Sequence, residues 1–176
     1  VLVRIAEATE PTKDDTVLEI GPGLGALTAK LLETAGKVVA VEKDDTLYSI
    51  LSEKFAKQIK SGQLDLINKD IQDFDPEYLR KTKGSTYKIA ANIPYNLTGL
   101  IIRNFLSGPY QPSKMVLLVQ KEVVDRILAH DKKESLLSIS VKVYGTPKRI
   151  TNVARGNFNP MPRVDSAVFS VDNISR

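Results

Sequence analysis

A short apolar segment that runs directly into a glycine-rich turn constrains the fold of this 176-residue chain more than any other feature. Thr16 to Ile20 has the composition of a buried strand, and a helical pattern extends from Ala26 to about Leu32. The turn between them is Gly21-Pro22-Gly23-Leu24-Gly25. Glycine permits the sharp turn, and its missing side chain lets a ligand approach the backbone closely. The segment therefore predicts a strand, a ligand-binding loop and a helix of an α/β fold.

The rest of the chain repeats this alternation of strand and helix. Further strands are predicted at 37–41, 64–67, 87–91, 115–119, 149–154 and 166–171, and helices at 46–59, from about 98 and at 122–128. Residues 135–144 fit a strand and a helix equally well. We predict one Rossmann-like α/β domain over residues 1–176, with a mostly parallel seven-stranded sheet and helices on both faces.

Composition excludes several classes of protein. The chain has no cysteine, which excludes disulfides and thiolate metal sites, and we expect no metal site. No apolar run approaches the roughly 20 residues of a membrane helix, so we expect a cytoplasmic protein without a membrane partner. Residues 132–176 contain 8 Lys or Arg and 3 Asp or Glu, although the whole chain has a net charge of only +4. This basic stretch is either a solvated face or a surface that contacts phosphates.

Two acidic residues follow the second and third predicted strands. Glu42 is placed to accept hydrogen bonds from both hydroxyls of a ribose, and Asp70 to accept one from an adenine amine. Open α/β sheets bind ligands where such strand ends meet. The loop with Ala26 also satisfies the loose dinucleotide fingerprint, so a nicotinamide-dependent oxidoreductase remains an alternative, as does a turn that binds nothing. Glu19, as an anion, would favour a cationic ligand over a pyrophosphate.

The tetrapeptide Asn92-Ile93-Pro94-Tyr95 ends the fourth predicted strand and points to a family. With the segments 17–25, 120–126 and 158–168, it resembles the ribosomal RNA adenine dimethyltransferases, whose relatives include mitochondrial transcription factors and macrolide-resistance methylases. The resemblance covers nearly the whole chain, and 120–126 is closer to the small-subunit branch. It implies a class I methyltransferase fold, S-adenosylmethionine as the cofactor, and adenine of small-subunit ribosomal RNA, free or in a pre-assembled subunit, as the substrate.

The resemblance also implies a set of site residues. Asn92 and a backbone carbonyl near Ile93 would accept the two hydrogens of the adenine amine, while Tyr95 and Phe158 would stack on the base. We predict that methyl transfer involves Asn92, Ile93, Pro94, Tyr95 and Phe158. We predict that the cofactor contacts Glu19, Gly21, Pro22, Gly23, Gly25, Glu42, Lys43, Asp70, Ile71 and Asn92.

The sequence also departs from the family. Val1 falls after the family's usual N-terminal segment, and Arg176 falls before its small helical domain. Residues 135–139 read Ser-Leu-Leu-Ser-Ile in place of the usual Tyr-Gly-Arg-Leu-Ser run. We therefore expect a monomeric catalytic core with weak cofactor binding and poor methylation of ribosomal particles. A non-catalytic nucleic-acid-binding relative of the transcription-factor type is the main alternative from another functional class.

Overall fold

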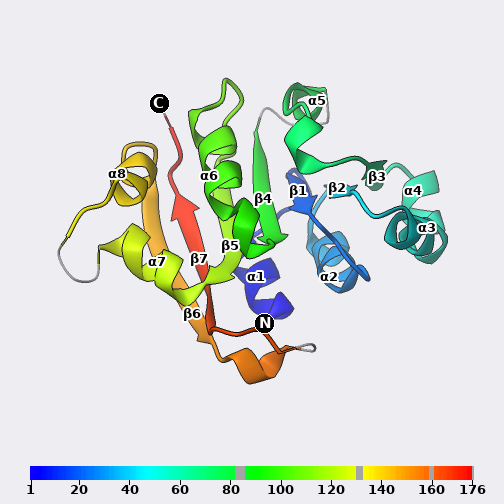
Figure 1. The fold of residues 1–176 in the computed structure, drawn as a ribbon. Helices are drawn as coiled ribbons and strands as arrows, with labels where there is room; N and C mark the ends of the chain where they lie inside the picture. The colour runs from blue at the N-terminus through cyan, green and yellow to red at the C-terminus, as the bar shows by residue number, and fades with distance from the viewer. Residues whose placement is uncertain (82–85, 130–132, 159–160, 176) are drawn as a thin grey trace.

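One mixed sheet organises the molecule, which a computed structural model describes at residues 1–81, 86–129, 133–158 and 161–175. Within those residues the sheet has seven strands in the order β3-β2-β1-β4-β5-β7-β6 (Figure 1). Strand β7 is antiparallel to both of its neighbours, and all other neighbouring pairs are parallel. The prediction of a mostly parallel seven-stranded sheet is therefore confirmed. The strands are β1 (Thr16–Ile20), β2 (Lys37–Glu42), β3 (Leu64–Asn68), β4 (Tyr87–Asn92), β5 (Lys114–Gln120), β6 (Thr146–Val153) and β7 (Ser166–Asp172).

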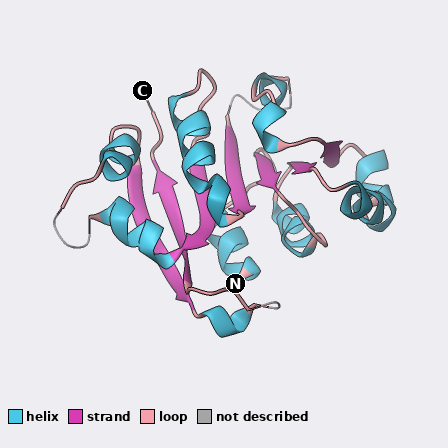
Figure 2. Ribbon diagram, viewed as in Figure 1, coloured by secondary structure: helices cyan, strands magenta, loops and turns pink. Residues whose placement is uncertain are grey.

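Helices cover both faces of this sheet (Figure 2). Apolar side chains alternate along the buried strand β1, so that Leu18 belongs to one core and Val17 to the other. The core on the Leu18 side is completed by α5 (Glu77–Arg80), α6 (Thr98–Ser107), α7 (Lys121–Leu128) and α8 (Leu136–Lys142). The core on the Val17 side is completed by α1 (Leu2–Thr9), α2 (Ala26–Thr34), α3 (Asp45–Lys54) and α4 (Ala56–Lys60).

The helix predicted at 46–59 is in fact two helices, α3 and α4, which meet at Phe55. Phe55 leaves the helical conformation, with φ −109° and ψ 22°, and its side chain is buried next to Gly25. Ile50, expected on the apolar face, is 43% exposed. Packing of Phe55 against the glycine loop thus outweighs the regular helical spacing of this segment.

Residues 135–144 form a helix, which resolves the ambiguity of their pattern. Ser135 caps α8 by accepting a hydrogen bond from the backbone N–H of Ser138. Val141 is buried, whereas Ile139 and Val143 are exposed. Strand β6 consequently begins at Thr146, three residues before the predicted start at 149. Helix α1 has no counterpart among the elements predicted from the sequence.

Candidate active site

The loop between β1 and α2 turns through three glycines in the left-handed region. Gly21, Gly23 and Gly25 have φ values of 66°, 58° and 77°. The N–H of Gly21 donates to the carbonyl of Val41 at 3.0 Å, which fastens the loop to the end of β2. No atom lies within 4 Å of where a Cβ would stand at Gly21 or Gly23, so both face open space. The backbone of these two glycines is therefore accessible to a ligand.

A cavity of about 210 Å³ lies beside this loop, at the carboxyl ends of the central strands. The strand register explains its position, because Ile20 of β1 pairs with Val41 of β2 and with Ala91 of β4. Several strands therefore end at one edge, where open parallel sheets bind their ligands. The lining residues are Ile20, Gly21, Gly23, Val41, Glu42, Lys43, Lys69, Asp70, Ile71, Asn92, Pro94 and Leu97.

Glu42 is the most enclosed charged residue of this lining. Its side chain accepts hydrogen bonds from the N–H of Gly23 at 3.2 Å and from the N–H of Asp44 at 3.0 Å. Only 6% of the residue is exposed, which fixes the carboxylate at the end of β2. Each carboxylate oxygen has a second lone pair for a ligand donor such as a hydroxyl. Glu42 therefore both braces the glycine loop and presents acceptors to the cavity.

Asp70, which follows β3, also lines the cavity. One of its oxygens accepts a hydrogen bond from the N–H of Gln72 at 3.0 Å and caps the 3-10 turn Ile71–Asp73. The other lies 3.8 Å from the ammonium of Lys43, whose side chain is 65% exposed. This cap fixes the carboxylate, and its remaining lone pairs are available to an amine or hydroxyl.

Asn92 ends β4 and brings its side-chain amide to the cavity. Its side chain makes no hydrogen bond with the described parts of the chain, although it lines the cavity. Buried Ile93 follows, and its N–H donates to the carbonyl of Leu118 at 3.4 Å. Pro94, which also lines the cavity, begins the turn into the 3-10 segment Tyr95–Leu97. The side chain of Tyr95 lies outside the described residues.

Glu19 is buried beneath the loop and does not belong to the cavity lining. It is 1% exposed, and neither carboxylate oxygen has a hydrogen-bond partner within the described segments. The pKa of Glu19 is raised to about 8, chiefly by burial. Nearby Thr28 lowers the pKa, although it makes no hydrogen bond of ordinary geometry with the carboxylate, and the charge of Glu42 adds to the rise. The acid is therefore largely protonated near neutral pH, so the expected charge effect on a ligand does not operate in the free protein.

The structure brings most of the predicted site residues together, with some exceptions. Gly21, Gly23, Glu42, Lys43, Asp70, Ile71, Asn92 and Pro94 line the cavity, whereas Glu19, Pro22, Gly25, Ile93 and Phe158 do not appear in its lining. Pro22 and Gly25 are buried parts of the same loop. Phe158 follows the 3-10 turn Arg155–Asn157 and is half-buried against the core on the α2 side.

Four lining residues escaped sequence analysis: Ile20, Val41, Lys69 and Leu97. Ile20 and Val41 immediately precede Gly21 and Glu42 at the ends of predicted strands. Their position could therefore have indicated that they line the site. Leu97 reaches the cavity only through the 3-10 turn after Pro94, which no periodicity indicates. The described residues contain no cluster of side chains suited to a metal ion. None of their helices has the length and apolar character needed to cross a membrane.

Comparison with known proteins places the whole chain in one group. The family model for ribosomal RNA adenine dimethylase matches residues 1–175. Ribosomal RNA small subunit methyltransferase A of Dehalococcoides mccartyi (strain CBDB1) is 43% identical over 171 residues, which are 97% of this chain and 57% of that protein. Its namesake from Geobacter metallireducens is 37% identical over 173 residues, covering 97% and 62% of the two chains. The chain therefore spans about three fifths of these relatives.

Solved structures give the same picture at the level of the fold. The 23S rRNA methyltransferase ErmE superposes with a TM-score of 0.86 at 26% identity, covering 99% of this chain and 68% of that one. A dimethyladenosine transferase from Plasmodium falciparum superposes with a TM-score of 0.80 at 32% identity, covering 97% and 60%. The fold is thus that of class I methyltransferases.

Proposed function

Because this chain belongs to the ribosomal RNA adenine dimethylase family, we propose that it transfers methyl groups from S-adenosylmethionine to the exocyclic amine of adenine in small-subunit ribosomal RNA. The relatives that are named small subunit methyltransferases support the choice of RNA. By the same resemblance, two adjacent adenines are each methylated twice, in free RNA or in a pre-assembled subunit. We propose that the protein acts as a monomer.

One observation carries this proposal: Glu42, Asp70 and Asn92 share a single cavity with the open face of the glycine loop. They come from the ends of β2, β3 and β4, so they are far apart in the sequence. Two fixed carboxylates and one amide next to accessible backbone fit a nucleoside on one side and an adenine amine on the other. Such an arrangement accelerates methyl transfer mainly by holding the methyl donor and the amine in the reactive geometry.

The lining fits S-adenosylmethionine by the chemistry of its donors and acceptors. Glu42 would accept hydrogen bonds from the ribose hydroxyls, and Asp70 from the adenine amine. The bare backbone of Gly21 and Gly23 would allow close approach, with Lys43 and Ile71 beside the nucleoside. Glu19, Pro22 and Gly25 would shape the loop from beneath. When bound, S-adenosylmethionine supplies an electrophilic methyl group on a positively charged sulfur.

Asn92 would orient the substrate amine. The lone pair of this nitrogen is delocalised into the purine ring, which makes it a poor nucleophile. The Asn92 side-chain oxygen and the backbone carbonyl of Ile93 would accept its two hydrogens and disfavour that delocalisation. Pro94 would hold the chain in its turn at this point. No strong base is required, because the proton leaves after the new carbon–nitrogen bond has formed.

Aromatic side chains would receive the adenine after it leaves its stack. We assign this role to Tyr95 and Phe158, since stacking on an aromatic face recovers roughly 1–3 kcal/mol per base. Phe158 is half-buried against the α2-side core, so its packing would have to leave one face of the ring for the base. Phe158→Leu would preserve most of the packing while removing the stacking surface.

The alternative functions predict different results. A nicotinamide-dependent oxidoreductase is not favoured, because β7 inserts antiparallel between β5 and β6, which departs from the order of dinucleotide-binding sheets. A non-catalytic nucleic-acid-binding relative would bind RNA with no methyl transfer. The position of Asn92 at the cavity favours the enzyme.

Mass spectrometry of undermethylated small subunits, incubated with the protein and S-adenosylmethionine, tests the proposal. We expect new methyl groups on adenine and a decrease in rate of about a hundredfold or more in Asn92→Ala, because orientation supplies most of the catalysis. Asn104→Ala, an exposed asparagine of α6, serves as the matched control and should retain the rate. Labelling of cytosine or protein, or full activity in Asn92→Ala, would contradict the assignment.

A further inference from the structure

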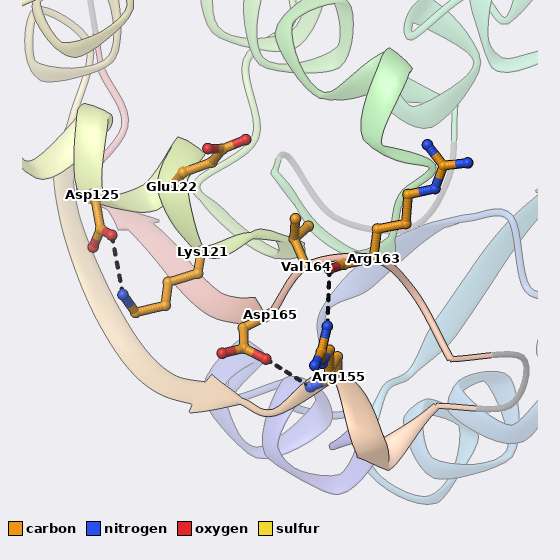
Figure 3. A pocket seen from close by; sticks show the side chains of 7 residues that line it. All are labelled: Lys121, Glu122, Asp125, Arg155, Arg163, Val164 and Asp165. Atoms are coloured by element: carbon orange, nitrogen blue, oxygen red, sulfur yellow. Dashed lines mark hydrogen bonds and ion pairs between the residues drawn. The ribbon is translucent and has the colours of Figure 1, made fainter.

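A second, larger cavity lies on the same side of the sheet as the proposed methyl-transfer site, where the parallel strands have their carboxyl ends. Its volume is about 430 Å³, and it is lined by three basic residues, three acidic residues and a valine: Lys121, Arg155, Arg163, Glu122, Asp125, Asp165 and Val164. Lys121 begins α7 directly after β5, and Asp165 immediately precedes β7 (Figure 3). Neither this cavity nor its arginines take part in the proposed chemistry.

Asp165 fixes the geometry of this cavity through the backbone. Its carboxylate accepts a hydrogen bond from the N–H of Arg155 at 2.9 Å, and its carbonyl accepts one from the N–H of Lys121 at 3.0 Å. The guanidinium of Arg155 reaches the carbonyl of Arg163 at 3.4 Å. Three chain segments are therefore tied together, and two arginines are held on the wall of one cavity.

The acidic residues of the lining form no ion pair with these two guanidiniums among the described residues, and Glu122 of the same lining forms none either. Asp125 is engaged elsewhere, because its oxygens pair with Arg149 and with Lys121, and the hydrogen bond from Arg149 holds the pKa of Asp125 below its usual range. Within the described residues, neither Arg155 nor Arg163 makes an ion pair with a carboxylate. Figure 3 shows the Arg163 side chain extending away from Arg155. A planar guanidinium without a carboxylate partner is well suited to a phosphate.

The distance to Asn92 fits a nucleotide close to the target base. Asn92 pairs with Leu118 on the neighbouring strand, and Lys121 follows three residues later. At about 3.3 Å per residue, Lys121 at the start of the cavity therefore lies about 10 Å from Leu118, the strand partner of Asn92, measured along β5. An RNA strand whose adenine enters the first cavity would pass over the second with its neighbouring nucleotides.

From these observations we propose that Arg155 and Arg163 each bind a phosphodiester group of the RNA next to the methylated adenine. This inference rests on the proposed function, since it takes RNA as the ligand. Asp165 acts as a positioning residue, because it holds the backbone of Arg155 rather than contacting the ligand. The site would add affinity and register on the RNA without reading its sequence.

Binding of a fluorescent oligoadenylate of about twelve nucleotides, measured against salt concentration by anisotropy, tests this site. For Arg155→Gln/Arg163→Gln we expect affinity to fall about tenfold or more. The slope of log affinity against log salt should decrease by about 0.7 for each lost phosphate contact. Arg155→Lys/Arg163→Lys should restore the slope but not the full affinity, since lysine keeps the charge and loses the planar fork.

The control is Lys57→Gln/Lys60→Gln on α4, at the β3 end of the sheet, which removes the same charge far from the cavity (Figure 1). It should leave both slope and affinity unchanged. An unchanged slope in the arginine variant, an equal effect in the control, or no salt-dependent binding by the unmodified protein would overturn the proposal. The assay involves no methyl transfer, so it separates failure of this site from failure of the proposed activity.

Discussion

Glu42 shows how one buried carboxylate serves both the fold and a ligand. Its two backbone hydrogen bonds connect the glycine loop to the segment after β2. The same oxygens line the cavity, where a ribose would supply further donors. Because amides already hold the carboxylate, a ligand need not order it on binding, which reduces the entropic cost of association.

Glu42→Gln should therefore weaken binding of S-adenosylhomocysteine by about tenfold or more, since hydrogen bonds to a charged group contribute about 1.5–3 kcal/mol each. The new amide NH₂ would also face an N–H donor of Gly23 or Asp44. Isothermal titration calorimetry measures the affinity. Glu53→Gln, an exposed residue of α3, removes the same charge and should bind normally. Equal affinities of the two variants would exclude Glu42 from the binding site.

At the level of elements, the loop after β1 also positions the paired helices α3 and α4. A Cβ at Gly25 would stand 2.5 Å from the Phe55 ring and 2.7 Å from the Leu51 side chain. The close approach of α3 to the start of α2 thus requires a glycine here. Gly62, between α4 and β3, has nearly the same φ, 78°, but nothing within 4 Å of its Cβ position.

Comparing Gly25→Ala with Gly62→Ala separates steric crowding from backbone strain. Gly62→Ala should lower the free energy of unfolding by about 1–2 kcal/mol, the cost of a left-handed conformation in a residue with a side chain. Gly25→Ala should lose about 1–3 kcal/mol more, because Phe55 and Leu51 would have to move. Urea unfolding gives both values. Similar losses in the two variants would show that the Phe55 and Leu51 side chains move aside without lowering the free energy of unfolding.

The same elements show what sequence patterns can and cannot predict. The strands and the residues at their ends were predictable, because buried parallel strands are apolar throughout and their carboxyl ends meet at one edge. The break at Phe55 was not, since it depends on contact with Gly25, which is distant in the sequence. Helix α8 was ambiguous because Ile139, Val141 and Val143 alternate as in a strand, although only Val141 is buried. The placement of Phe158 against the α2-side core likewise depends on packing between segments that no local pattern reports.

At the scale of the whole molecule, stability should depend on pH through acids shifted in opposite directions. Burial alone would raise the pKa of Asp15, but hydrogen bonds from Lys88 and Thr12 outweigh it and lower the pKa. The hydrogen bond from Arg149 lowers the pKa of Asp125. Stability from these acids is present above their unfolded pKa values and is lost as the pH falls through the folded ones. Asp15 and Asp125 therefore stabilise the folded protein at moderate pH, and this contribution disappears in strong acid.

Glu19 acts in the opposite sense and in a different pH range. Burial raises its pKa from 4.5 to about 8, so between these values the folded protein holds a proton that the unfolded chain has released. The free energy of unfolding should therefore fall as the pH rises from 4.5 towards 8, by on the order of 5 kcal/mol, and level off above. Glu19→Gln should abolish this decline, because the amide does not ionise.

Urea unfolding of the wild type, Glu19→Gln and Glu53→Gln across this range measures the effect. The slope with pH is the informative quantity, since the substitution also changes stability by a constant amount at every pH. Glu53→Gln, at an exposed acid on α3, should keep the wild-type slope. Parallel curves for the wild type and Glu19→Gln would mean that the carboxyl beneath the loop is already ionised in the folded protein. The negative charge proposed from the sequence to attract a cationic ligand would then be present before binding.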